Sequence, residues 1–297
     1  MTKTKKRPAY RQAVIGMVYD FDGTLSPNNM QEDTIFRAWG IEKHQFWRKA
    51  DSLVSQGYER TLAYLRLLIH DPAFQKKPLR RQDLQRLARH IEYYPGVPDF
   101  FKGIDRILKK VPEVHEWGIR VEHYIVSSGM KEILEGASLI KHFKRIYACE
   151  YDYGPKGALF PKLVINDTNK TQFLFRINKG RLDMGQDIND HMPEEERRIP
   201  FKNMIYIGDS VTDIPSMTVM NRYGGHAIAV FDPNGRIPDK VKRLVIDGRV
   251  SHFAPADFRK SSLLFKIIRR TLNKIIHGIA YDASAAMSLA WMADHNR

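Results

Sequence analysis

The sequence predicts an α/β fold, a doubly wound parallel sheet with a helical segment inserted after the first strand. Two observations carry this prediction. Short apolar, β-branched segments alternate with segments of helical periodicity along much of the 297 residues. Between residues 30 and 115, helical periodicity dominates and strand signals are few. Because alternating strands and helices join by right-handed crossovers into a parallel sheet, we interpret the long helical stretch as an insertion into it.

The composition excludes several protein classes. Apolar residues make up 43% of the chain and charged residues 28%, which is usual for a globular protein and excludes a disordered one. Cys149 is the only cysteine, so an internal disulfide and a Cys-rich zinc site are excluded, and we expect a reducing, cytoplasmic location. No apolar run reaches the roughly 18 residues of a membrane span. The basic arm from Met1 to Arg11 lacks the apolar stretch of a secretory signal.

The chain is strongly basic. It has 48 Lys and Arg against 34 Asp and Glu, a net charge of +14. This charge favours an anionic partner: a phosphorylated metabolite, a nucleic acid or a membrane surface. It does not choose among them, and basic runs are also common on solvated helix faces.

The elements follow in order from the first strand. Residues 13–19 predict a strand buried on both faces, which ends where Gly23 and Pro27 mark a turn. After the helical stretch, strands are expected at 121–126 and 145–149, and a polar stretch suits a hairpin at 151–165. The later expectations are a helix at 170–179, a charged loop at 180–200, strands at 203–207, 226–231 and 243–246, and a long amphipathic helix from 261 to 279.

Three predicted strand ends carry acidic or small polar residues. These are Asp20 and Asp22, then Ser127, Ser128 and Gly129, then Asp209 and Asp213. One such residue alone is most simply a turn or helix cap. Ligands of a doubly wound sheet bind beyond the carboxyl ends of the strands, so all three sets together predict a site. Clustered carboxylates repel unless a cation joins them, and Mg²⁺ prefers oxygen ligands and suits phosphoryl chemistry. The amides after Ser127 begin a helix and suit an anion.

The motifs themselves resemble those of a known superfamily. Asp20-Phe-Asp-Gly-Thr after an apolar strand resembles the first motif of the haloacid dehalogenase-like superfamily. Ile125-Val-Ser127 resembles the second and Gly208-Asp-Ser-Val-Thr-Asp213 the fourth, in the same order and at similar spacing. The resemblance implies a Rossmann-like catalytic core (1–27 and 116–255), a helical cap (28–115), and a separate C-terminal amphipathic helix and tail (256–297).

Within that superfamily the chain most resembles the phosphoserine phosphatase-like branch. The shared features are the helical cap, Val-Ser-Ser-Gly after the second strand, and a hairpin-like stretch before the lysine motif. The charged segment 181–200 and the basic C-terminal helix depart from that pattern, so phosphoserine is not assigned as the substrate.

The resemblance also implies a role for each site residue. Asp20 would attack phosphorus to form an aspartyl-phosphate, and Asp22 would act as general acid and then base. Ser127, with Ser128 and Gly129 beside it, would bind the phosphoryl group. Mg²⁺ would be held by Asp20, by the main-chain carbonyl of Asp22 and by Asp209, while Asp213 would support the metal and orient a lysine.

The lysine motif has no fixed neighbours, so alternatives stay open. Lys170 begins the helix that precedes the Asp209 strand, which is where the superfamily places this residue. Lys156 and Lys179 are the alternatives, and Lys179 lies near the far end of the same helix.

The implied activity is magnesium-dependent hydrolysis of a small phosphomonoester. Asp22 is the residue that phosphatases and phosphomutases of the group carry, which argues against carbon–halogen cleavage. A phosphomutase or phosphotransferase would use the same residues. A third possibility is a nucleic-acid- or membrane-binding module, favoured by the basic helix with Lys266, Arg269, Arg270 and Lys274.

The expected ligands follow from the same motifs. A cap favours a small metabolite over nucleic acid, and glycine-rich nucleotide motifs are absent from the sequence, so we expect neither nucleic acid nor a nucleotide cofactor. Candidates in the cap for contacting the leaving group are Gln31, Glu32, Arg37, Phe46, Trp47 and Arg48.

Overall fold

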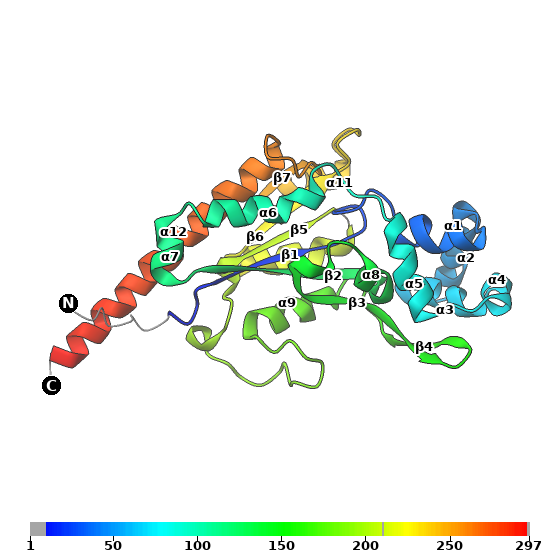
Figure 1. The fold of residues 1–297 in the computed structure, drawn as a ribbon, viewed down its shortest axis with the longest axis horizontal. Coiled ribbons are helices and arrows are strands. Elements are labelled where there is room, and N and C mark those ends of the chain that lie inside the picture. The colour runs from blue at the N-terminus through cyan, green and yellow to red at the C-terminus, as the bar shows by residue number, and fades with distance from the viewer. Residues whose placement is uncertain (1–9, 210, 296–297) are drawn as a thin grey trace.

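The centre of the molecule is a seven-stranded sheet, shown in Figure 1 by a computed structural model that describes residues 10–209 and 211–295. The strand order is β4-β3-β2-β1-β5-β6-β7, and all neighbouring pairs are parallel except the antiparallel hairpin β3–β4. The strands are β1 (Val14–Tyr19), β2 (Arg120–Met130), β3 (Phe143–Gly154), β4 (Gly157–Leu163), β5 (Met204–Gly208), β6 (His226–Phe231) and β7 (His252–Pro255). The predicted doubly wound α/β fold is therefore confirmed.

The position of β1 explains where a site must form. All six of its residues, VIGMVY, are buried, because helices cover both faces of the sheet. The chain runs from β1 to β2 and β3 on one side and later returns to β5 on the other side. The strand order thus reverses at β1, and side chains following β1, β2 and β5 meet beyond their carboxyl ends.

Helices cover the sheet and extend from one end of it (Figure 1). Helices α6, α7 and α12 lie along one face, and α9 lies on the other. The helices of the inserted segment are η1 (Glu32–Phe36), α1 (Arg37–Trp39), α2 (Lys43–Ser55), α3 (Arg60–His70), α4 (Pro72–Lys76), α5 (Arg81–Leu87), η2 (Ala88–His90), α6 (Val97–Leu108) and α7 (Pro112–Trp117). The later ones are α8 (Lys131–Gly136), η3 (Ile140–His142), α9 (Lys170–Lys179), η4 (Glu194–Glu196), η5 (Phe201–Asn203), η6 (Val211–Asp213), α10 (Ile214–Arg222), α11 (Asp239–Ile246) and α12 (Leu263–His295).

The segment 28–115 is helical but lies in two places. Helices α1 to α5 form a group beyond one end of the sheet, whereas α6 and α7 pack beside α12 (Figure 1). The rings of Phe100 and Phe101 in α6 lie 6.3 and 6.1 Å from the ring of Tyr19 in β1. We therefore propose that the cap spans residues 28 to about 95 and that α6 and α7 belong to the core. Of the predicted divisions, residues 1–9 and 296–297 lie outside the described residues.

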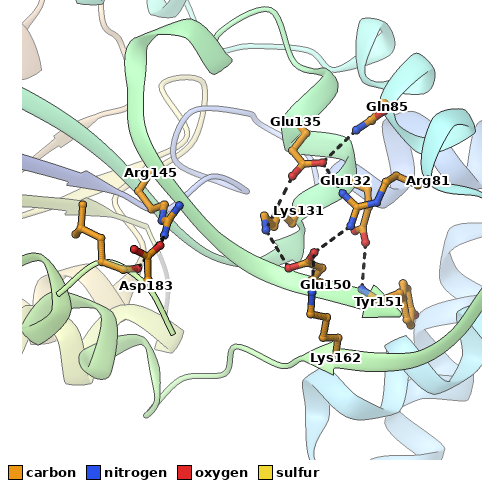
Figure 2. A network of polar contacts seen from close by, with 11 residues as sticks. Arg81, Gln85, Lys131, Glu132, Glu135, Arg145, Glu150, Tyr151, Lys162 and Asp183 are labelled. Atoms are coloured by element: carbon orange, nitrogen blue, oxygen red, sulfur yellow. Dashed lines mark hydrogen bonds and ion pairs between the residues drawn. The ribbon is translucent and has the colours of Figure 1, made fainter. Parts of the chain in front are cut away.

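A polar network fastens the inserted helices to the core (Figure 2). Arg81, in α5, donates to Glu135 of α8 and to Glu150 of β3, each at 2.9 Å. Glu150 also accepts a hydrogen bond from Nζ of Lys131 at 2.9 Å, and its Oε1 lies 3.6 Å from Nζ of Lys162 in β4. One inserted helix, α5, thus meets α8, β3 and β4 of the core around one shared carboxylate.

The C-terminal helix α12 has two different halves. Its first half packs on the sheet through a buried apolar stripe that includes Leu264, Ile268, Leu272, Ile276 and Ile279. All described side chains from Ser284 to Ala293 are exposed, and Figure 1 shows this end projecting beyond the sheet. Among the described residues, no helix has both the length and the apolar character needed to cross a bilayer.

One predicted strand is wrong. Residues 243–246 belong to α11, which begins after Pro238 and buries Val241 and Leu244, three residues apart on one helical face. The last strand is β7 instead, a segment of four residues too short to show a period in the sequence. The helix predicted at 170–179 is confirmed as α9, with the same bounds.

Candidate active site

Asp20 lies directly after β1 and is fixed by the neighbouring backbone. Its amide donates to the carbonyl oxygen of Ile207 in β5 at 2.9 Å. Its carboxylate accepts from the amide of Phe21 at 2.7 Å, and only 5% of the residue is exposed. The hydrogen bond from Phe21 fixes Oδ1, so the other carboxylate oxygen, Oδ2, stays available at the carboxyl ends of the strands.

Lys170 supplies the cation at this position. Its Nζ lies 3.1 Å from Asp20 Oδ2 and donates to Asp213 Oδ1 at 2.8 Å, and the residue is fully buried. The hydroxyl of Tyr206 donates to the same oxygen of Asp213 at 2.6 Å. Asp213 therefore holds the lysine in place, as a positioning residue would.

The other two candidate lysines lie elsewhere. Lys179, at the far end of α9, donates to the carbonyl oxygens of Ile188 and Asp190 at 2.6 and 2.7 Å. Lys156 is exposed in the turn between β3 and β4. Only Lys170, of the three, meets Asp20.

Asp209 completes a carboxylate cluster. Carboxylate oxygens of Asp20, Asp209 and Asp213 lie within 4.8 Å of one another. Gly23 has a φ of 74°, and a Cβ there would lie 2.4 Å from Asp209 Oδ2, so only glycine lets the first motif pass this close. Asp209 Oδ1 is buried and has no hydrogen-bond partner among the described residues. An orphaned carboxylate oxygen beside two more carboxylates fits a hard divalent cation.

The electrostatics of the cluster also favour a cation. Burial, followed by repulsion from Asp213, raises the pKa of Asp20 to about 7, although Lys170 opposes this rise. Burial, followed by repulsion from Asp213 and Asp20, raises the pKa of Asp209 to about 8. Burial and the charge of Asp20 raise the pKa of Asp22 well above its usual range. Without an added cation the three carboxyls cannot all be ionised near neutral pH.

Asp22 and the end of β2 form the adjacent walls. Asp22 accepts from the amide of Met30 at 2.9 Å, which holds its carboxyl at the start of the inserted helices. Ser127 is buried, and its Oγ accepts from the amide of Gly129 at 3.0 Å. The hydroxyl of Ser128 is buried without a partner among the described residues. An unpaired hydroxyl in the same cavity as the Lys170 ammonium group is suited to bind an anionic oxygen.

A cavity of about 600 Å³ joins these groups. Asp20, Asp22, Ser127, Ser128, Gly129, Lys170 and Asp209 all line it, so the structure brings together every predicted site residue except Asp213, which lies behind Lys170. Of the cap candidates, Gln31, Glu32 and Trp47 line the cavity, whereas Arg37, Phe46 and Arg48 are not among its lining residues. Phe46 instead packs against Phe36, with ring centroids 4.6 Å apart.

Three further cavity residues come from the start of α3. These residues are Arg60, Thr61 and Tyr64, and no motif in the sequence marks them. The only available signal is Glu59, which accepts from the amide of Leu62 and begins the helix. The hydroxyl of Tyr64 donates to the carbonyl oxygen of Ser128 at 2.5 Å and so ties α3 to the end of β2.

Comparison with known proteins agrees with this geometry. A family model described as haloacid dehalogenase-like hydrolase matches residues 17–218, about two thirds of the chain and all the motifs above. The chain belongs to the haloacid dehalogenase-like hydrolase family. A curated relative from Borreliella burgdorferi, described as an uncharacterized protein, is 27% identical over 284 residues, covering 87% of this chain and 96% of that protein.

Several solved structures share the fold of this chain. A substrate-bound phosphoserine phosphatase complex is 14% identical with a TM-score of 0.52, covering 86% of this chain and 97% of that one. A probable phosphoserine phosphatase from Vibrio cholerae has the same identity and TM-score, over 94% of this chain and 68% of that one. A HAD family hydrolase from Salmonella enterica serovar Typhi is 17% identical with a TM-score of 0.51, over 83% and 67%. The predicted likeness in fold to the phosphoserine phosphatase-like branch is thus confirmed.

Proposed function

We propose that this protein is a magnesium-dependent phosphatase that hydrolyses a small phosphomonoester through an aspartyl-phosphate on Asp20. The observation that carries this proposal is the buried contact of Lys170 with Asp20 and Asp213 at the wall of the cavity. The similar solved structures include phosphoserine phosphatases, which supports phosphatase activity as the reaction class. An identity of 14% does not identify the substrate. The single cysteine supports the further proposal of a cytoplasmic location.

The residues divide the reaction between them. Asp20 Oδ attacks phosphorus as the ester oxygen leaves, and Asp22 donates a proton to that oxygen. Asp22 then takes a proton from the water that releases phosphate from Asp20. Its raised pKa suits it to hold that proton at neutral pH.

The remaining groups hold the phosphoryl oxygens. Lys170 and the hydroxyl groups of Ser127 and Ser128 surround the position where its negative charge is concentrated. Mg²⁺, held by Asp20, Asp209 and the main-chain carbonyl of Asp22, would add positive charge there. The cavity of about 600 Å³, lined in part by the inserted helices, has the size of a small-molecule site and favours a metabolite as the substrate.

A hydrolysis assay tests the proposal. We expect the protein to release phosphate from an aryl phosphate with Mg²⁺, and to lose activity with chelator and in Asp20→Asn. Asp51→Asn, an exposed carboxylate of α2, is the matched control and should keep full activity. Full turnover by Asp20→Asn would remove the nucleophile assignment. Transfer of phosphate to an added alcohol without release of free phosphate would favour the phosphotransferase alternative.

A further inference from the structure

The projecting end of α12 exposes apolar side chains that the body of the protein leaves uncovered. Tyr281 is 75% exposed, Leu289 and Trp291 are each 64% exposed, and Met292 is 51% exposed. Apolar residues surround this part of the helix on nearly all sides, a pattern that is stable only when another surface covers it.

The first half of the same helix exposes a different chemistry. From Leu263 to Tyr281 the sequence has no Asp or Glu, and the exposed side includes Lys266, Arg269, Arg270 and Lys274. No ion pair of these four occurs among the described residues; the nearest carboxylate contact on this face is Glu113 with His277, at 3.4 Å. Residues 266, 270, 274, 277, 281, 284, 288 and 292 recur every three or four positions, and Arg269 and Trp291 stand three positions after Lys266 and Ser288. The basic side therefore continues into the apolar end as one stripe that includes all ten residues.

Helix α6 adds to the positive charge beside α12. A groove of about 370 Å³ lies between them. Its floor includes Ile107, Val111 and Phe265, and its rim carries four cations: Arg106, Lys110, Lys260 and Arg269. A groove with an apolar floor and a cationic rim matches a molecule that has an anionic head and an apolar tail.

We propose that this stripe of α12, with the adjoining groove, binds the surface of an anionic phospholipid membrane. The basic half would meet the headgroups, and Tyr281, Trp291 and Met292 would enter the boundary between headgroups and acyl chains. Charge complementarity selects this partner. A second copy of the chain would bring the same positive stripe, and a nucleic acid would leave the apolar end uncovered. The projecting end of α12 lies at the opposite end of the molecule from helices α1 to α5 (Figure 1), and no described residue of the stripe or of the groove lines the cavity. This inference is therefore independent of the proposed function.

Vesicle flotation with the full chain tests the inference. We expect the protein to float with vesicles of phosphatidylcholine mixed with phosphatidylglycerol, to stay behind with phosphatidylcholine alone, and to dissociate as salt is added. The double variant R269Q/K274Q should lower the partition coefficient on the order of 25-fold, because each basic residue near such a surface contributes about fivefold. The double variant W291S/M292S should also lower it.

Matched variants and other outcomes make the test decisive. The double variant K156Q/R222Q removes the same charge at exposed positions outside the stripe, and F160S removes an exposed aromatic ring of β4. Both should float like the parent chain, and thermal melting by circular dichroism should show that all four variants are folded. Flotation that is equal in R269Q/K274Q and K156Q/R222Q would overturn the inference. So would a dimer that W291S/M292S dissociates, or a salt-sensitive shift on nucleic acid without binding to vesicles.

Discussion

Lys170 is the residue on which both stability and chemistry depend. Its ammonium group is buried between the carboxylates of Asp20 and Asp213, and these two charges together raise its pKa. Removing a buried cation leaves its partners as uncompensated buried charges, which is far costlier than losing a surface pair.

Lys170→Met is therefore expected to lower the free energy of unfolding by about 3–5 kcal/mol and to abolish hydrolysis. Lys170→Met/Asp213→Asn should recover part of the stability, because one of the two unpaired carboxylates is gone, but none of the activity. Urea unfolding and the aryl phosphate assay measure the two effects separately. Lys179→Met, on the same helix, is the control and should cost far less. A double variant no more stable than Lys170→Met would contradict the charge argument.

His123 makes the fold sensitive to acid. It is buried in β2, where Tyr19 OH lies 2.9 Å from its Nδ1, and burial lowers its pKa to about 3. The unfolded chain, with an ordinary histidine pKa near 6.5, binds a proton that the folded chain excludes, so stability is lost as pH falls from about 6.5 towards 3.

We expect the free energy of unfolding to fall between pH 7 and about pH 4.5, with His123 contributing about 2–3 kcal/mol of that loss. In His123→Gln, which retains an acceptor for Tyr19, this difference between the two pH values should shrink by that amount. His44→Gln, at an exposed site in α2, is the control for the loss of one histidine. If the free energy of unfolding of His123→Gln falls between the two pH values by as much as that of the parent chain, His123 takes up a proton in the folded state and the argument is wrong.

At the scale of elements, the carboxylate of Glu150 holds the inserted helix α5 on the core (Figure 2). It contacts Arg81, Lys131 and Lys162, and its side chain is only 11% exposed, whereas that of Arg81 is 38% exposed. Loss of the shared anion leaves three cations close together, while loss of Arg81 leaves the anion with two partners.

Glu150→Ala should therefore destabilise the protein by about 2–3 kcal/mol, and Arg81→Ala by only about 1 kcal/mol. Urea unfolding of both variants measures the difference. Lys242→Ala, which breaks an exposed pair with Asp239, is expected to cost under about 0.5 kcal/mol. Equal losses in the Glu150 and Arg81 variants would show that the network has no central member.

The elements also show what the sequence can and cannot predict. Asp20, Ser127 and Asp209 could be predicted because each follows a strand that is clear in the sequence. Lys170 was preferred over Lys156 and Lys179 because the family resemblance places its lysine at the start of the helix before the Asp209 strand. Arg60 was not, because its place at the cavity depends on how α3 packs against β2, a contact between distant segments.

The same limit explains the errors in the helices and strands. The periodicity of α6 resembles that of α3, so the sequence could not show that α6 covers the sheet while α3 lies beyond it. β7 has four residues, and no period can be read from so few. Local pattern thus predicted the type of each long element, but not which surface it covers.

At the scale of the whole molecule, α12 is part of the fold in its first half only. Ile275, Ile276 and Ile279 are buried, and Lys202 of η5 donates to Asp282 at 2.7 Å. Beyond Ala283 the described side chains are exposed and contribute little to the core. The chain should therefore tolerate the loss of its last turns but not of the turns before them.

A chain ended after Ser284 is expected to keep its melting temperature and its hydrolytic activity, since it retains every buried residue of α12. A chain ended after Asn273 loses three buried isoleucines at roughly 1.5–3 kcal/mol each, which is comparable to the whole stability of a typical domain, so it should not fold. Thermal melting by circular dichroism distinguishes the two. If the chain ended after Asn273 unfolds cooperatively at the parent temperature, the second part of α12 adds nothing to the core. If the chain ended after Ser284 has a lowered melting temperature, the projecting end folds back onto the body in solution. The chain that ends after Ser284 lacks Trp291 and Met292 but keeps the four cations of the basic half. Its binding to vesicles should therefore weaken without being abolished, which separates the electrostatic from the apolar contribution of a single helix.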